Sequence, residues 1–124
     1  MLFKLAEAGN IDLLVSAEVL TEAEAVIRRK APSNLAFQTL LLDRARVSMV
    51  PAADSDILQQ CEVLVSDQAD AVIVAAAWAA RPDYFVTLDR RHLLGNASLG
   101  AAVPFPIGTP GDCLAWYREQ LAPE

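Results

Sequence analysis

Residues 67–94 read DQADAVIVAAAWAARPDYFVTLDRRHLL, and this stretch decides the fold. Its apolar first half predicts a helix that opens with its two aspartates and ends at Ala80. Pro82 and Asp83 predict a turn, and the aromatic and β-branched run 84–88 predicts a strand. A short helix is expected over residues 90–94, directly after that strand.

The rest of the chain also alternates between predicted helices and short aliphatic strands. Further helices are expected at residues 2–8, 16–30, 33–43, 54–65 and 111–121, and strands at residues 11–15, 47–50 and 103–107. Pro104 and Pro106 cannot donate to a strand ladder, so they place the last strand at a sheet edge. Strands separated by helices favour parallel pairing, so the sequence predicts an α/β fold, a three-layer α/β/α sandwich with a mostly parallel sheet. We expect one domain over residues 1–124.

Composition excludes several classes of function. The formal net charge of −6 is opposite in sign to that of proteins that bind nucleic acid tightly without sequence preference. The longest apolar stretch, residues 71–80, is too short to span a membrane, and Glu7 interrupts any secretion signal, so we expect a cytoplasmic protein. Cys61 and Cys113 lie too far apart for a metal motif and are expected to be reduced core residues.

Three acidic residues are predicted to meet at one edge of the sheet. In right-handed β-α-β units, helix starts and the carboxyl ends of strands share an edge. Glu22 lies near the start of the helix that follows the first strand, Asp70 opens the helix before the 84–88 strand, and Asp89 directly follows that strand. Because clustered carboxylates repel one another, such a cluster stays ionised only when cations neutralise it. Oxygen ligands of this kind predict Mg²⁺ or Mn²⁺.

Each of these acids also has an interpretation without function. Glu22 could be a surface acid near a helix start, and Asp67 with Asp70 has the spacing of a capping box. Asp89 could cap the short helix after it. The convergence of three such residues on one edge favours a metal site over three unrelated caps. His92, the only histidine, is expected to be a surface residue, because no acceptor that would orient it can be identified from the sequence.

Four segments resemble the PIN domain in order and spacing, and most closely the toxin-type PIN proteins of bacterial toxin–antitoxin pairs. They are SAEVLTE at 16–22, DAVIVAAA at 70–77, FVTLDRRHLL at 85–94 and IGTPGDCL at 107–114. The resemblance implies an Mg²⁺- or Mn²⁺-dependent endoribonuclease that cleaves single-stranded RNA, is neutralised by an antitoxin protein and forms a homo-oligomer.

The resemblance also assigns roles to single residues. Glu22, Asp70 and Asp89 match the acids that hold the metal and carry catalysis. Thr87 matches the hydroxyl residue just ahead of the last acid and is expected to contact the substrate. Arg90 and Arg91 are then placed to hold the RNA backbone, although a solvated surface is the alternative for both.

One departure from the family pattern concerns the amino terminus. The resemblance implies an amino-terminal central strand with a further aspartate, and neither is found in this sequence. We therefore expect an amino-terminally truncated PIN-like domain whose first central strand is missing. A catalytically inactive PIN-like module that acts through dimerisation or antitoxin binding is the alternative to the enzyme.

Overall fold

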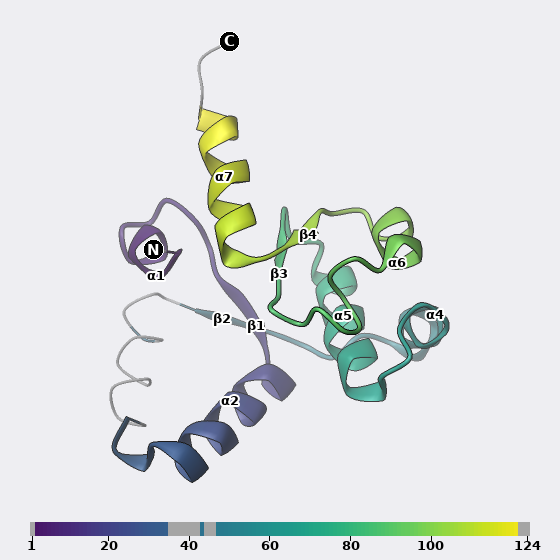
Figure 1. Ribbon diagram of the computed structural model, residues 1–124, viewed down its shortest axis with the longest axis horizontal. Coiled ribbons are helices and arrows are strands. Elements are labelled where there is room, and N and C mark those ends of the chain that lie inside the picture. Colours follow the sequence, from purple (N-terminus) through teal and green to yellow (C-terminus); the bar gives the residue numbers. More distant parts are fainter. Residues whose placement is uncertain (1, 35–42, 44–46, 122–124) are drawn as a thin grey trace. The chain divides into compact units, whose positions relative to one another are not determined.

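The computed structural model describes residues 2–34, 43 and 47–121, and the chain forms two compact units, Met1–Ala52 and Ala53–Glu124 (Figure 1). The first unit contains α1 (Leu2–Glu7), β1 (Leu14–Ser16), α2 (Ala17–Lys30), the 3₁₀ helix η1 (Pro32–Asn34) and β2 (Ser48–Val50). The second contains α4 (Ser55–Leu64), α5 (Gln68–Ala80), β3 (Phe85–Val86), α6 (Ala97–Ala102), β4 (Ile107–Gly108) and α7 (Pro110–Leu121). Helices alternate with short parallel strands, so the predicted α/β class is confirmed.

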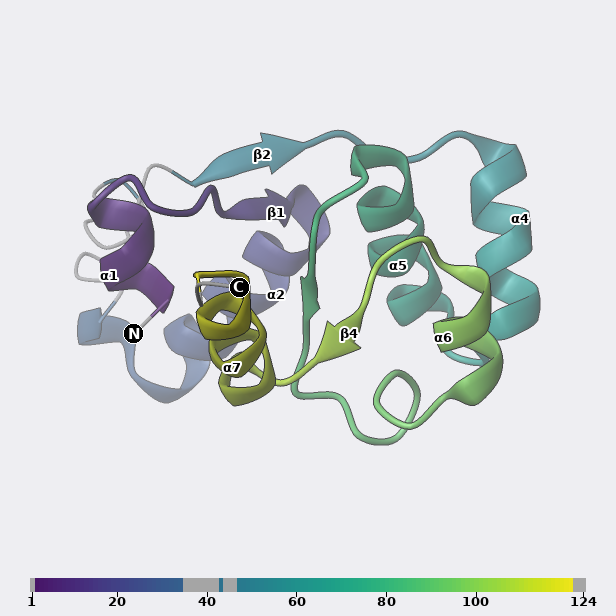
Figure 2. The same cartoon turned by 90° about the horizontal axis from the view of Figure 1, so that it is seen from above.

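In the first unit, β1 and β2 run side by side as a parallel pair (Figure 2). Leu14 lies opposite Ser48, and Ser16 lies opposite Val50. The predicted strand at 11–15 is shifted toward its carboxyl end, where Ser16 closes the strand and caps the next helix. Its hydroxyl accepts a hydrogen bond from the Val19 N–H at 3.3 Å, as predicted. This cap fixes where α2 begins.

In the second unit, α4 and α5 pack against each other and form one wall of the hydrophobic core (Figures 1 and 2). The buried side chains of this core are Cys61, Val65, Ala71, Val74, Ala75, Leu93, Leu99, Val103 and Phe105. Burial raises the pKa of the Cys61 thiol, which keeps this cysteine in its unreactive protonated form. The core therefore joins the helix pair to the segment that follows β3.

The strand predicted at 103–107 is largely wrong. Val103 and Phe105 are buried in the core, and only Ile107 of this run belongs to β4. Prolines on both sides of Phe105 cannot donate to a ladder, so the ordered pairing begins only after them. The parallel β3–β4 pair is closed by hydrogen bonds from Phe85 N–H to the Pro106 carbonyl and from Thr87 N–H to the Gly108 carbonyl, both 2.9 Å.

The helix predicted at 90–94 is also wrong, because these residues form a turn. The Asp89 carboxylate and its carbonyl hold the turn together, with the Leu94 N–H donating to the Asp89 carbonyl at 2.8 Å. Gly95 has a φ of +79°, a left-handed conformation that ends the turn. Asn96 then caps α6, a helix that the sequence did not lead us to expect.

The remaining predicted elements agree with the structure at most boundaries. Asp54 caps α4 and Asp67 caps α5, as expected from the sequence. Most of the helix predicted at 33–43 lies outside the described residues, and Ser33 belongs to η1. Within the described part of the chain, no helix has both the length and the apolar character needed to cross a membrane.

Candidate metal centre

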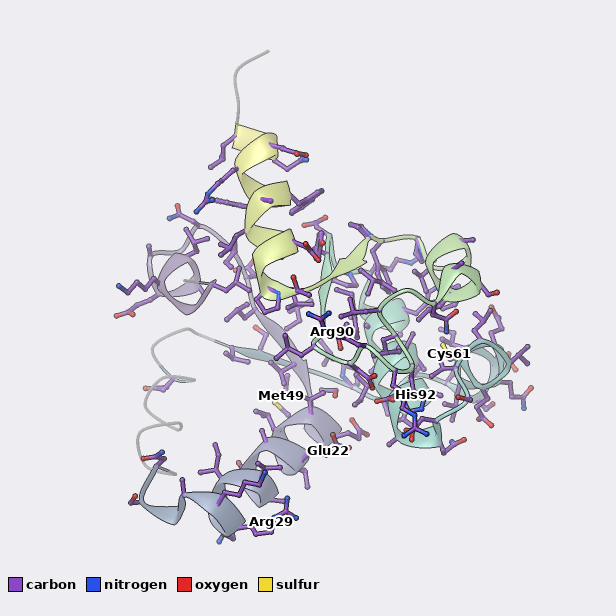
Figure 3. The ribbon with its side chains drawn as sticks, viewed as in Figure 1. Glu22, Arg29, Met49, Cys61, Arg90 and His92 are labelled. Carbon is purple, nitrogen blue, oxygen red and sulfur yellow. The ribbon has the colours of Figure 1, made fainter. Side chains whose placement is uncertain are left out.

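Asp70 lies in the first turn of α5, and its side chain faces His92. The Asp70 N–H donates to Oδ1 of Asp67 at 3.0 Å, so Asp67 is the N-cap of this helix. The Asp70 carboxylate points toward the turn that follows β3: its Oδ2 lies 3.0 Å from Nδ1 of His92. Figure 3 shows the His92 side chain beside the first turn of α5.

The two carboxylate oxygens of Asp89 have different partners: one accepts backbone hydrogen bonds, and the other faces the His92 ring. Its Oδ1 accepts hydrogen bonds from the N–H groups of Arg91 and His92, both at 2.9 Å. Its Oδ2 lies 3.5 Å from Nδ1 of His92. The expectation that Asp89 caps the segment after it is therefore met, in a turn instead of a helix. The same hydrogen bonds fix the second oxygen in place.

Thr87 positions Asp89 from the other side. The Asp89 N–H donates to Oγ1 of Thr87 at 3.1 Å, so the hydroxyl predicted to contact substrate binds the backbone of an acidic residue. Since the Thr87 N–H belongs to the β3–β4 ladder, the sheet, the hydroxyl and Asp89 form one continuous chain of hydrogen bonds. Thr87 thereby fixes the position of the Asp89 backbone relative to the β3–β4 pair.

Three side chains come close enough to share one cation. Ligand atoms of Asp67, Asp70 and His92 all lie within 4.8 Å of one another. The side chains of His92, Asp70 and Asp89 are 22%, 19% and 28% exposed, which leaves the cluster half-buried but reachable from solvent. Carboxylate oxygens with one imidazole nitrogen form a donor set that suits a divalent cation such as Mn²⁺ or Mg²⁺. These residues fit such a metal.

The pKa values of the two facing acids are shifted in opposite directions. Burial, the hydrogen bond with Asp89 and the charges of Asp89 and Asp67, in that order, together raise the pKa of Asp70 from 3.8 to about 6. The backbone N–H of His92, as the largest cause, lowers the pKa of Asp89. Burial and the neighbouring carboxylates thus disfavour the ionised form of Asp70, a cost that a bound cation would offset.

Glu22 belongs to the first unit, on α2, and its place in the metal cluster remains a prediction. Its side chain is exposed and lies in a shallow depression with Ala17, Glu18 and Thr21. Val26, one turn further along, is 43% exposed, and every residue of α2 is at least partly exposed. The helix face that carries Glu22 is therefore open.

Arg90 and Arg91 are both exposed and lie beside the acids. Together with His92 they line an open groove of about 620 Å³. Its other walls are Glu62, Val63, Leu64, Ser66, Leu94, Gly95 and Asn96. Figure 3 labels Arg90 and His92, which both belong to the turn after β3. The groove is thus lined by the two arginines, His92 and Glu62.

Sequence reasoning missed two members of this cluster. His92 was expected to be a surface residue without an orienting acceptor, but Asp70 and Asp89 both face its ring. The available signal was the spacing Asp89-x-x-His92, which places the histidine N–H on the aspartate side chain. Asp67 was correctly interpreted as a cap, but its position within 4.8 Å of the other two donors follows only from the folded turn.

Comparison with protein families identifies the family of the chain. A PIN domain model matches residues 1–91, close to three quarters of the chain. The chain belongs to the PIN domain family. Comparison with curated proteins and with solved structures found no match. PIN domains are generally nucleases and typically use divalent metals, so this PIN domain has a nuclease role at that general level. The matched span includes Glu22, Asp70 and Asp89, and it ends one residue before His92.

Proposed function

We propose that this PIN domain is a metal-dependent endoribonuclease that cleaves single-stranded RNA as the toxin of a toxin–antitoxin pair. The observation that carries the proposal is the half-buried meeting of Asp70, Asp89 and His92, with Asp67 at its rim. A surface acid needs no such arrangement, because solvent keeps it ionised without partners. Here burial, together with the charges of Asp89 and Asp67, raises the pKa of Asp70 and so destabilises its ionised form.

The side chains would divide the work of the reaction. Asp70, Asp89 and, from the first unit, Glu22 would hold Mg²⁺ or Mn²⁺. When bound, the cation would neutralise phosphate charge and activate a water molecule. Thr87 and the turn hold Asp89 in one orientation, so little rearrangement is needed on binding. Asp89, at least among the proposed ligands, is therefore held by its backbone before a metal binds.

Arg90 and Arg91 would hold the RNA backbone in the groove. Both side chains are exposed, and both residues line the open groove of about 620 Å³. Because the chain carries a net charge of −6, RNA contact has to be local, and these two arginines supply positive charge beside the acids. We expect binding to weaken as salt rises, with a smaller salt dependence when both arginines are replaced.

The decisive test is cleavage of unstructured RNA by the purified protein with Mn²⁺ or Mg²⁺. Asp89→Asn should abolish cleavage while the fold survives, because the asparagine oxygen can still accept the two N–H groups of the turn. Asp54→Asn serves as the matched control, since Asp54 caps α4 by the same kind of hydrogen bond away from the cluster. Equal rates for Asp89→Asn and the parent, or no metal-dependent cleavage, would leave the inactive-module interpretation.

We also propose that an antitoxin protein covers this edge and that the toxin acts in the cytoplasm as a homo-oligomer. Leu88, directly before Asp89, is 75% exposed, and Val86 is 38% exposed. Apolar side chains next to a polar site suit a partner that blocks it. Expression in bacterial cells should arrest growth, Asp89→Asn should not, and light scattering of the purified protein should show a mass above that of one chain. Growth arrest by both proteins would contradict the ribonuclease toxin.

A further inference from the structure

Side chains of other residues hold the backbone of His92 through hydrogen bonds to both its N–H and its carbonyl group. Its N–H donates to Oδ1 of Asp89 at 2.9 Å, and its carbonyl accepts from Nδ2 of Asn96 at 3.1 Å. The next residue, Leu93, is 4% exposed and belongs to the hydrophobic core. Anchors on both sides of the backbone leave only the side-chain torsions of His92 free. The fold therefore fixes the backbone of His92 and the region that its ring can reach.

Asn96 ties this turn to the helix pair. Its Nδ2 also donates to the Leu64 carbonyl at the end of α4, at 2.9 Å, and its Oδ1 accepts from the Leu99 N–H at 3.0 Å. One side chain thus connects the end of α4, the turn and the start of α6. Because α4 packs against α5, the turn that carries His92 has a defined place relative to the start of α5.

The spacing of the donor atoms is that of a coordination sphere. Nδ1 of His92 lies 3.0 Å from Oδ2 of Asp70 and 3.5 Å from Oδ2 of Asp89. Around an octahedral cation with bonds of about 2.1 Å, neighbouring ligands lie about 3.0 Å apart and opposite ligands about 4.2 Å apart. The observed separations, including the 4.8 Å limit that also contains Asp67, need only small adjustments to reach this geometry.

We propose that His92 binds the divalent cation directly through Nδ1 and that it makes the site prefer Mn²⁺ over Mg²⁺. The inference rests on the proposed metal site and adds a nitrogen ligand to its carboxylates. Imidazole nitrogen binds transition metals well, whereas Mg²⁺ strongly favours oxygen ligands and water. A nitrogen in the sphere therefore raises affinity for Mn²⁺ more than for Mg²⁺.

Coordination requires a free electron pair on Nδ1. The ring then carries its single proton on Nε2. As the metal–nitrogen bond forms, a doubly protonated ring releases its Nδ1 proton to solvent, whereas a neutral ring loses a proton at Nδ1 and takes one up at Nε2. Both carboxylates are then free to bind the same cation as anions. The histidine and the two acids change together from a hydrogen-bonded cluster to a ligand set.

Electron spin echo envelope modulation of bound Mn²⁺ tests the proposal directly. The chain has a single histidine, so an untagged protein labelled only with ¹⁵N-histidine reports on His92 alone. We expect nitrogen modulation from Mn²⁺ that changes from the ¹⁴N to the ¹⁵N pattern on labelling. This measurement needs no substitution, so it does not depend on how a variant folds. Bound Mn²⁺ without histidine modulation would overturn the proposal.

Binding titrations of His92→Gln measure the preference between the two metals. We expect Mn²⁺ affinity to fall by about tenfold and Mg²⁺ affinity by much less, with Asn10→Gln in the first unit as a control that leaves both unchanged. Equal losses for Mn²⁺ and Mg²⁺ would overturn the proposed selectivity. RNA cleavage is measured separately. Cleavage by a protein whose bound Mn²⁺ shows no histidine nitrogen overturns only the His92 proposal. Histidine coordination in a protein that cleaves no RNA overturns only the proposed ribonuclease activity.

Discussion

Two helices of the second unit begin in the same way, but only one of them starts a candidate metal site. Asp54 caps α4 and Asp67 caps α5, and in each case Oδ1 accepts an N–H from the residue three positions later at 3.0 Å. Each helix also has a second aspartate in its first turn, Asp56 in α4 and Asp70 in α5. Asp56 is exposed, whereas Asp70 is half-buried against His92.

The difference comes from the turn that follows β3 and not from the helices themselves. This turn presents His92 and Asp89 to the start of α5, and Asn96 fixes it to the end of α4. The start of a helix therefore supplies acidic residues. At α5, the turn after β3 packs against these residues, and this makes Asp70 a candidate metal ligand. Substitutions at matched positions of the two helices can test this difference.

The largest expected effect is on catalysis. Asp70→Asn should reduce RNA cleavage by about a hundredfold or more, because a metal ligand supports several kcal/mol of transition-state stabilisation. Asp56→Asn removes the same charge from the first turn of α4 and should leave the rate within about twofold. Initial rates at saturating Mn²⁺ provide the measurement. Similar losses in both variants would show that helix charge, and not the cluster, controls the rate.

The next largest effect concerns the tie between the turn and α4. Asn96→Ala removes the α6 cap and leaves the carbonyls of Leu64 and His92 without this donor, which should lower the free energy of unfolding by about 2 kcal/mol. Asn96→Ser keeps a capping oxygen and should lose about half as much. Urea unfolding measures both values. If the serine variant lost as much as the alanine variant, the two carbonyl contacts would be the main source of stability.

Local hydrogen bonds explain what could be predicted from the sequence. Ser16 and Asp67 were interpreted as caps and Asp54 as the start of a helix, because a cap depends on residues only three positions away. The parallel pairing of the strands followed from their alternation with helices. The meeting of Asp70 and Asp89 followed from their places at the start of a helix and the end of a strand.

Contacts between distant residues explain what could not be predicted. The run at 90–94 has helical composition, but the buried Leu93 and the bond from Asn96 to Leu64 hold it as a turn. The orientation of the His92 ring toward Asp70 depends on that turn, and the spacing Asp89-x-x-His92 indicates only the bond from the His92 N–H to Asp89. Val103 and Phe105 were assigned to a strand because burial in a core and burial in a sheet produce the same apolar pattern.

A smaller effect concerns the dependence of stability on pH. The pKa of Asp70 in the folded protein is about 6, above its unfolded value of 3.8, so the folded state holds more protons between these values. Stability should therefore fall as pH rises from about 4 to about 6 and stay lower above it. For a carboxyl group that is partly exposed, we expect a cost of about 1 kcal/mol.

This pH dependence separates Asp70 from Asp56. In metal-free protein, Asp70→Asn should raise the free energy of unfolding by about 1 kcal/mol at pH 7.5 and have little effect at pH 4. Asp56→Asn should give a curve parallel to that of the parent. Saturating Mn²⁺ should reverse the order at pH 7.5, because only the parent retains the ligand. A parent curve that runs parallel to the Asp70→Asn curve would contradict the raised pKa.

The smallest expected effect compares the two caps. Asparagine is as good an N-cap as aspartate, so Asp54→Asn and Asp67→Asn should each change the free energy of unfolding by less than about 0.5 kcal/mol. Only Asp67 lies within 4.8 Å of the donors of Asp70 and His92. Asp67→Asn should therefore weaken Mn²⁺ binding by about threefold, measured by calorimetric titration, while Asp54→Asn leaves it unchanged. An unchanged Mn²⁺ affinity in both variants would mean that Asp67 only caps α5, and that the cation is held by the acids that face His92.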